Sequence, residues 1–210
     1  MPDVEDKPKL VIDRLMVIGA NGIGTFFLRA LSEAIARKHV KFANHQVLVM
    51  DDDDIEKKNT RYALWEERDI GGNKAVLMSY RYGFVGLAER VETLKKIKEL
   101  KPDIIVLCAD NNTVRRLVLK SGVPFIDCRA EGRIISVFNM IGYDDKAKAK
   151  YLEMTPEIEN EEGGSCQREE DLAAGTIQYG HRISAELGLQ TLMNYSRQEV
   201  AGPRNTIIQV

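Results

Sequence analysis

LMVIGANGIG, residues 15–24, joins a short apolar run to a turn that contains three glycines. Apolar residues then recur at helical spacing over residues 26–38, so the stretch predicts a strand, a tight turn and a helix. The turn fits the pattern G-x-x-G-x-G at Gly19, Gly22 and Gly24. Backbone N–H groups and the positive end of a helix can hold a phosphate there, although the glycines could also serve only close packing of helix on strand. The strand–turn–helix context favours a nucleotide site.

The rest of the chain alternates between apolar strands and helical stretches. Further strands are predicted at residues 46–50, 89–92, 104–108, 124–128 and 134–140, and helices begin near residues 72, 93 and 112. Right-handed crossovers between parallel strands place the helices on the faces of the sheet. The sequence therefore predicts an α/β fold with a Rossmann-like, doubly wound, mostly parallel sheet and helices on both faces.

Residues 1–210 are expected to form one domain, because this length can bury a core without disulfides or a structural metal. The core is predicted at about residues 10–142. The segment at about residues 143–172 is polar and acidic, and we expect it to be a mobile crossover loop. One closing helix is predicted at about residues 173–197.

Basic and acidic residues nearly balance, with 30 Lys and Arg against 32 Asp and Glu. Such a chain has no global field that would attract nucleic acid or an anionic membrane. No apolar run approaches the ~20 residues that span a bilayer, and the charged N-terminus is unlike a secretion signal. We expect a cytoplasmic protein that binds neither nucleic acid nor a membrane directly.

Polar residues cluster where the predicted strands end. Asp51 and Asp53 follow the second strand, where a dinucleotide-binding domain carries an acid for the ribose, so an NAD-linked oxidoreductase is one reading. A nucleoside triphosphate also needs cations and amide donors along its phosphates and a carboxylate for Mg²⁺. Those groups are supplied by Asn59, Arg61, Lys74 and Asp110. Because NAD has no γ-phosphate to hold, this set favours ATP with Mg²⁺.

Four ordered motifs make the pattern more specific. They read D-x-D-x-I-x-x-x-N at residues 51–59, D-I-G-x-N-K at 69–74, C-A-D-N-x-x-x-R at 108–115 and A-E-G-R-I-I-S-V-F at 130–138. In this order they resemble the ThiF/MoeB and ubiquitin-activating-enzyme superfamily of adenylating enzymes. The resemblance covers roughly residues 15–140 and implies an ATP-dependent adenylyltransferase, expected as a homodimer.

The resemblance also implies residue roles. Asp53 would bind the ribose, Asn59, Arg61 and Lys74 the phosphates, and Asp110 a magnesium ion near the α-phosphate. The remaining predicted nucleotide contacts are Gly19, Asn21, Gly22, Gly24 and Asp51. The acceptor would be the C-terminal glycine carboxylate of a ubiquitin-like or sulfur-carrier protein, which forms an acyl-adenylate and releases pyrophosphate. An ionised carboxylate needs no general base, so none of the three histidines is assigned a role.

The chain departs from the family pattern at three points. Asn21 replaces a glycine of the turn, and asparagine tolerates a left-handed backbone. The arginine that usually stands three residues after the motif asparagine is here Arg61, only two residues after Asn59. About a dozen residues precede the first strand, so an arginine that relatives supply across a dimer interface is expected to be missing. A nucleotide- or carrier-binding subunit that needs a partner is therefore the main alternative to an independent enzyme.

The spacing of the three cysteines favours neither a disulfide framework nor a zinc site, and no C-x-x-C pair occurs. Cys108 and Cys128 fall in predicted strands and are expected to be core residues. Cys166 follows Gly-Gly-Ser before the closing helix. In many relatives a loop cysteine accepts the activated acyl group, so Cys166 is either such an acceptor or an unreactive loop thiol.

Overall fold

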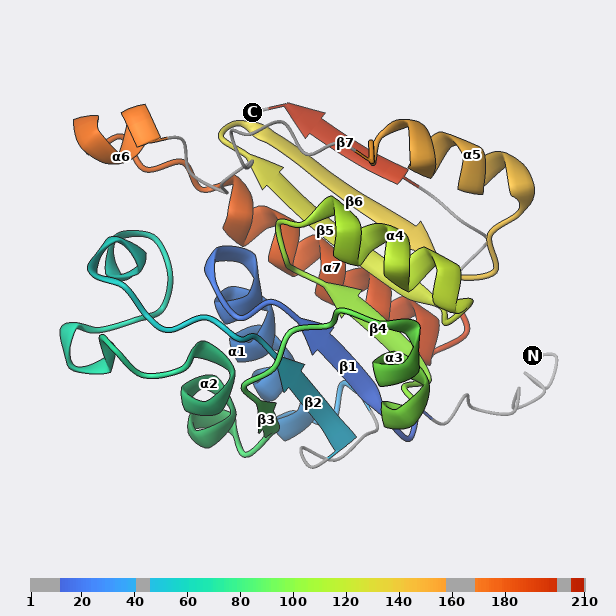
Figure 1. The fold of residues 1–210 in the computed structure, drawn as a ribbon, viewed down its shortest axis with the longest axis horizontal. Helices are drawn as coiled ribbons and strands as arrows, with labels where there is room; N and C mark the ends of the chain where they lie inside the picture. Colours follow the sequence, from blue (N-terminus) through green and yellow to red (C-terminus); the bar gives the residue numbers. More distant parts are fainter. Residues whose placement is uncertain (1–11, 41–45, 158–168, 200–204, 210) are drawn as a thin grey trace, which may run out of the picture.

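The computed structural model describes residues 12–40, 46–157, 169–199 and 205–209. They contain one seven-stranded sheet in the order β3-β2-β1-β4-β5-β6-β7 (Figure 1). The strands are β1 (Leu15–Ile18), β2 (Val47–Met50), β3 (Val85–Leu87), β4 (Ile104–Leu107), β5 (Phe125–Glu131), β6 (Ile134–Met140) and β7 (Asn205–Gln209). The strands from β3 to β5 in this order are parallel, whereas β6 and β7 run antiparallel to their neighbours. The predicted Rossmann-like, mostly parallel α/β fold is confirmed.

Two layers of helices cover the sheet. The helices are α1 (Gly22–Ala36), α2 (Lys74–Tyr82), α3 (Leu94–Leu100), α4 (Asn112–Ser121), α5 (Asp145–Glu153), α6 (Glu169–Ala174) and α7 (Gly180–Ser196), with short 3₁₀ turns η2 (Lys57–Arg61) and η3 (Glu67–Asp69). One apolar cluster joins α1, α2 and α7 to one face of the sheet, and a second joins α3, α4 and α5 to the other. Along β1, Leu15 and Val17 belong to the first cluster and Met16 and Ile18 to the second.

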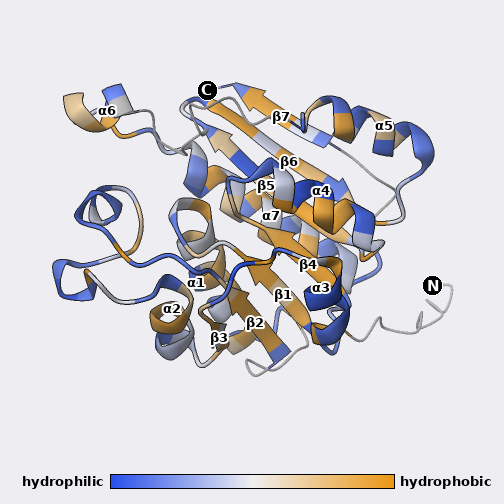
Figure 2. Cartoon of the chain, viewed as in Figure 1, coloured by the Kyte–Doolittle hydropathy of each residue, from blue (hydrophilic) through white to orange (hydrophobic). Residues whose placement is uncertain are grey.

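The central strands are apolar along their whole length because both of their faces are covered. All four residues of β1, of β2 and of β4 are buried. Figure 2 shows these strands as the continuous hydrophobic centre of the molecule. Their carboxyl ends meet at the same edge of the sheet, where the polar motifs follow.

The third strand was predicted at the wrong place. It lies at Val85–Leu87, not at residues 89–92. Gly86 weakens the apolar pattern there, but the strand needs it: a Cβ on Gly86 would lie 2.7 Å from the backbone oxygen of Ala75 and 2.9 Å from Oγ of Ser79. The glycine therefore lets α2 pack closely against the edge strand.

The expected irregular segment at about residues 143–172 contains two helices. Asp144 caps α5 by accepting a hydrogen bond from the N–H of Ala147. Tyr151 is the one buried residue of α5, so no apolar period marks the helix in the sequence. Residues 173–174, predicted as the start of the closing helix, belong instead to α6, which ends before the left-handed Gly175 at φ +74°. The closing helix α7 begins at Gly180. Residues 158–168 lie outside the described ranges.

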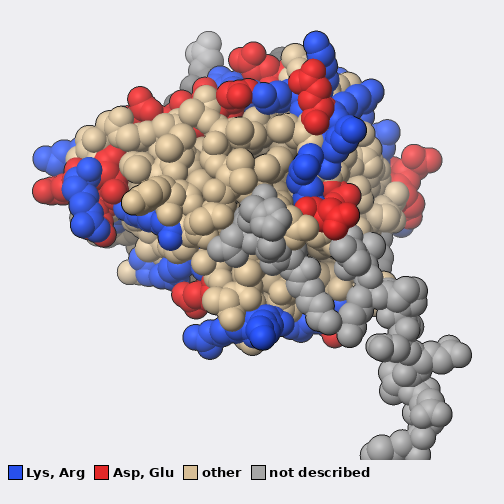
Figure 3. All heavy atoms as spheres, turned by 90° about the horizontal axis from the view of Figure 1, so that it is seen from below, with Lys and Arg blue, Asp and Glu red and all other residues tan. Residues whose placement is uncertain are grey.

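One face of the molecule carries few charges. Figure 3, seen from below Figure 1, shows a broad area without Lys, Arg, Asp or Glu that is bordered by charged side chains. The elements lowest in Figure 1 include α2 and β3, which expose Val76, Tyr80 and Val85. Among the described residues, no helix is both long and apolar enough to cross a membrane.

Candidate functional site

A pocket opens at the carboxyl ends of β1, β2 and β4. Since β2 lies on one side of β1 and β4 on the other, this is the switch point of the sheet, where open α/β folds bind ligands. The lining comes from five segments, namely the glycine turn with the end of β1, the end of β2, the residue after η2, the residues after β3 and the residues after β4. Its members are Ile18, Gly19, Asn21, Gly22, Met50, Asp51, Asp52, Asp53, Tyr62, Glu89, Arg90, Val91, Cys108, Ala109, Asp110, Asn111 and Val114.

The glycine turn is held against the end of β4. Gly19 has φ +97°, and a Cβ there would lie 2.7 Å from the backbone nitrogen of Ala109. A Cβ on Gly24 would lie 2.0 Å from the backbone oxygen of Gly19. The turn thus serves close packing and also brings the first residue of the 15-residue helix α1, Gly22, to the pocket wall. The first N–H groups of a helix have no partners within it, so they suit an anion.

Asn21 adopts a different backbone from the one expected. Its φ is −109°, so the position does not need the left-handed conformation of a glycine. Asn21 stands at the N-cap of α1 but makes no capping hydrogen bond with its side chain. Its Nδ2 donates instead to the hydroxyl of Tyr62, at 3.0 Å.

Asp51 shapes the turn. One carboxylate oxygen accepts a hydrogen bond from the N–H of Ala20 at 2.6 Å, and the other accepts from the N–H of Asp53 at 3.0 Å. Burial raises the pKa of Asp51, while the bond from Ala20 acts in the opposite direction. Both of its oxygens are thus engaged by the backbone.

Asp53 and Lys74 form an ion pair at the rim of the pocket. The Nζ of Lys74 lies 2.8 Å from Oδ2 of Asp53. The backbone holds the two together, because the N–H of Lys74 donates to the carbonyl of Asp53 at 3.0 Å and Nδ2 of Asn73 donates to the same carbonyl at 3.1 Å. Asn73 also caps α2 by accepting from the N–H of Val76. Asp53 lines the pocket, whereas Lys74 is 4% exposed and is not among the lining residues.

The predicted phosphate ligands Asn59 and Arg61 do not line the pocket. Asn59 is buried at 1% exposure, where its Oδ1 accepts from the N–H of Glu56 and its Nδ2 donates to Tyr62. Arg61 is exposed at the end of η2. The residue that does reach the pocket from this segment is Tyr62.

Asp110 lies in the pocket wall after β4, next to the cap of α4. Asn111 caps α4 by accepting from the N–H of Val114. An oxygen of Asp110 lies 3.7 Å from Nη2 of Arg115, which donates to the carbonyl of Ala109 at 3.1 Å. Asp110 is partly exposed to the pocket, at 41% of its side chain. It therefore offers a carboxylate of the kind that Mg²⁺ prefers.

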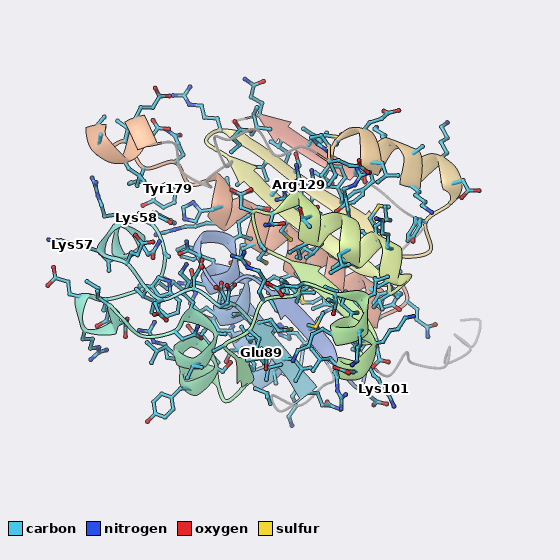
Figure 4. All side chains as sticks on the ribbon, in the orientation of Figure 1. Lys57, Lys58, Glu89, Lys101, Arg129 and Tyr179 are labelled. Atoms are coloured by element: carbon cyan, nitrogen blue, oxygen red, sulfur yellow. The ribbon has the colours of Figure 1, made fainter. Side chains whose placement is uncertain are left out.

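Carboxylates dominate the described lining of the pocket. Five acids are present, Asp51, Asp52, Asp53, Glu89 and Asp110, against one cation, Arg90. The carboxylate oxygens of Asp51, Asp52 and Asp53 lie within 4.8 Å of one another. Arg90 is itself paired with Asp52 at 3.2 Å. In Figure 4 the labelled Glu89 lies close to the ends of β2 and β3. A free polyanion would be repelled here, whereas a complex of that anion with divalent cations fits the donor set.

No family model matches the sequence, and no curated protein matches it. Solved structures do resemble the fold. E. coli MccB in complex with N-formylated MccA aligns with a TM-score of 0.65 at 15% identity over 94% of this chain and 62% of MccB. E. coli MccB with ATP aligns with a TM-score of 0.63 at 14% identity, over 94% of this chain and 61% of MccB. E. coli tRNA N6-threonylcarbamoyladenosine dehydratase, TcdA, aligns with a TM-score of 0.57 at 14% identity, over 89% of this chain and 85% of TcdA. The chain thus shares its fold with MccB and TcdA, whose fold is of the ThiF/MoeB type.

The chain spans about three fifths of the length of MccB. The resemblance noted from the ordered motifs is thus confirmed at the level of the fold. The pocket lies at the carboxyl ends of the strands, the edge of the sheet where the sequence places the polar motifs.

The ThiF/MoeB-type fold also buries a histidine to which the sequence assigned no role. His181, at the start of α7, is 1% exposed and packs against the rings of Phe26, Tyr62 and Tyr179. Burial lowers its pKa to about 4. Figure 4 places Tyr179 on the same side of the molecule as Lys57 and Lys58 of η2. The contact between the rings of His181 and Tyr62 thus links the start of α7 to the segment that follows η2.

Two of the three cysteines are placed by the structure. Cys108 and Cys128 are buried in the core, as expected. Cys166 lies outside the described residues, so its role as an acyl acceptor stays a prediction.

Proposed function

We propose that this chain activates a carboxylate with ATP and Mg²⁺, forming an acyl-adenylate and releasing pyrophosphate. The observation that carries the proposal is the convergence of three groups on one pocket. These are the start of helix α1, the ion pair of Asp53 with the buried Lys74, and the carboxylate of Asp110. The solved structure of MccB with ATP, which shares the fold, supports the choice of nucleotide.

The phosphates of the nucleotide would lie at the N-terminus of α1. The first turn of α1 carries no acidic residue, so the positive end of the helix stays available to an anion. Lys74 supplies the cation. An arriving triphosphate competes with Asp53 for the ammonium, and the carboxylate released in this way can accept hydrogen bonds from ribose hydroxyls.

Asp110, with Asp52, would hold Mg²⁺. These carboxylates are hard oxygen donors that reach the pocket, and the acid-rich lining suits a divalent cation. When bound, the ion neutralises phosphate charge as the α-phosphate is attacked. The protein needs no base for this step, because the attacking carboxylate is already ionised at neutral pH.

The proposed acceptor is the C-terminal carboxylate of a ubiquitin-like or sulfur-carrier protein. The complex of MccB with N-formylated MccA supports a second substrate for this fold in addition to nucleotide. The chain would act as a homodimer or with another subunit, because Arg90 is the one cation in the described lining and is already paired with Asp52. A cation from a second subunit would complete the phosphate site.

ATP–[³²P]pyrophosphate exchange tests the proposal. The chain is assayed with Mg²⁺ and a panel of carrier proteins, and Lys74→Ala is compared with Lys95→Ala, an exposed lysine on α3. We expect exchange in the wild type and in Lys95→Ala and its loss in Lys74→Ala. A background signal with every carrier, together with a melting temperature raised by NAD but not by ATP–Mg²⁺, would favour the oxidoreductase instead.

A further inference from the structure

The hydroxyl of Tyr62 is the meeting point of two asparagines. Tyr62 follows η2 and is 6% exposed, with its ring in the pocket wall. Nδ2 of Asn59 donates to the hydroxyl at 2.9 Å, and Nδ2 of Asn21 donates to it at 3.0 Å. A phenol oxygen accepts two hydrogen bonds and donates one. With both acceptor sites in use, the hydroxyl proton needs an acceptor elsewhere.

The orientation of Asn59 is fixed by its other contact. Its Oδ1 accepts from the N–H of Glu56 at 2.8 Å, so its Nδ2 must face Tyr62. Asn21 has no such constraint, because its Oδ1 is buried and has no hydrogen-bond partner among the described residues. If the side-chain amide of Asn21 were rotated by about 180°, Tyr62 would donate to its oxygen, and the NH₂ group would occupy the position where Oδ1 has no partner. With the amide as placed, the Tyr62 proton has no acceptor among the described residues, and with the amide turned over the Asn21 NH₂ group has none, so at least one donor of the pair is unused in either arrangement.

An unused buried donor is costly unless a ligand or water accepts from it. Both residues of the pair line the pocket, and Asn21 immediately precedes the first residue of α1. The donor thus lies beside the helix N-terminus, which attracts an anion. Packing holds the ring of Tyr62 in place, since it lies edge-on to the ring of His181 with centroids 6.3 Å apart.

We propose that Tyr62, paired with Asn21, is a binding residue that donates a hydrogen bond to a phosphoryl oxygen of the nucleotide. This inference rests on the proposed function. Tyr62, not its exposed neighbour Arg61, is the contact that this segment makes with the ligand. A neutral donor adds a hydrogen bond to a metal-bound phosphate without changing the charge of the pocket.

Tyr62→Phe removes the hydroxyl and keeps the ring packed on His181. Tyr179→Phe is the matched control, because Tyr179 stacks on the same histidine but is 57% exposed and does not line the pocket. Isothermal titration calorimetry measures the dissociation constants of ATP, inorganic tripolyphosphate, NAD and adenosine, each with Mg²⁺.

For Tyr62→Phe we expect the affinity for ATP and tripolyphosphate to fall about tenfold to a hundredfold, the effect of losing one hydrogen bond to a charged group. Adenosine binding should change less than about twofold, and Tyr179→Phe should bind every ligand like the wild type. An equal loss for adenosine and ATP would mean that the hydroxyl only supports the turn, and an unchanged affinity for every anion would mean no contact. Either result overturns the inference.

The same titrations separate this inference from the proposed function. If the wild type binds tripolyphosphate or NAD but not ATP, and Tyr62→Phe weakens that binding, the adenylation proposal fails and the Tyr62 contact stands. If ATP exchange proceeds and Tyr62→Phe binds ATP like the wild type, the contact fails alone. If the wild type binds none of the anions, both proposals fail.

Discussion

Lys74 and Asp53 are ion-paired at 2.8 Å, yet their side chains differ widely in solvent exposure. The side chain of Lys74 is 4% exposed and that of Asp53 is 58% exposed. A buried ammonium needs an anionic partner, because desolvation alone would disfavour its charge. The pair therefore holds a buried cation next to a carboxylate that faces the pocket.

Replacement of Lys74 by Met should separate binding from stability. Met keeps most of the buried volume and removes the charge, so we expect the free energy of unfolding to change by less than about 1.5 kcal/mol. ATP affinity should fall at least tenfold, which corresponds to about 1.4 kcal/mol. Urea unfolding and calorimetric titration measure the two effects, and Lys95→Met is the surface control. Wild-type ATP affinity in Lys74→Met would contradict a phosphate role for this lysine.

Removal of divalent cations should weaken nucleotide binding. The described lining has five carboxylates and one arginine, so ATP without a bound cation meets net repulsion. We expect EDTA to weaken ATP binding at least tenfold and Asp110→Asn to reduce that dependence on Mg²⁺. Titrations at several Mg²⁺ concentrations measure the effect. ATP binding that is equally tight in EDTA would argue against metal-assisted binding.

Gly19 and Gly71 provide a matched pair for testing the turn. Both have positive φ, +97° and +85°, but a Cβ on Gly71 would have no atom within 4 Å, whereas one on Gly19 would strike Ala109. We expect Gly71→Ala to cost about 1 kcal/mol of stability through backbone strain alone. Gly19→Ala should cost about 2–3 kcal/mol more because of the clash. Equal losses by urea denaturation would show that the turn and the end of β4 can separate without cost.

The fold could be predicted wherever both faces of an element are covered or a motif marks its end. β1, β2 and β4 read as continuous apolar runs because helices cover both sides of the sheet. The antiparallel direction of β6 also has a local signal, since only Gly132 and Arg133 connect it to β5. β7 has none, because most of its residues are exposed at the sheet edge.

The site could be predicted as a location but not in its contacts. The motifs placed Asp53, Lys74 and Asp110 at one edge of the sheet, and the structure brings them there. The sequence could not show that the 3₁₀ turn η2 exposes Arg61 and directs Tyr62 to the pocket. It also could not show that backbone amides engage both oxygens of Asp51, because that depends on how closely the glycine turn approaches β2.

A buried ionic cluster joins α5 to β5. Asp127 is fully buried, and its Oδ2 accepts hydrogen bonds from Arg129 and from the hydroxyl of Tyr151, each at 2.8 Å. Arg129, labelled in Figure 4, also donates to the hydroxyl of Thr155. We expect Asp127→Ala to cost about 3–5 kcal/mol, because the guanidinium groups of Arg129 and Arg115 lose their anion. Tyr151→Phe should cost about 1–2 kcal/mol. Urea unfolding measures both, and equal losses would contradict a central role for the carboxylate.

Protonation of His181 should destabilise the fold in mild acid. Burial lowers its pKa in the folded state to about 4, below the value of about 6.5 for an exposed histidine. Between these two values the unfolded chain binds a proton that the folded chain does not, so the free energy of unfolding decreases as the pH falls from about 6.5 to about 4.

The full shift corresponds to about 3 kcal/mol. His181→Phe removes the titrating group and keeps an aromatic ring against Phe26 and Tyr62, so its stability should depend less on pH in this window. Urea unfolding at pH 7, 6, 5 and 4 gives the two slopes, and His39→Phe, in an exposed segment after α1, is the control. Parallel pH profiles for the wild type and His181→Phe would show that His181 can be protonated without disturbing the contact between α7 and Tyr62.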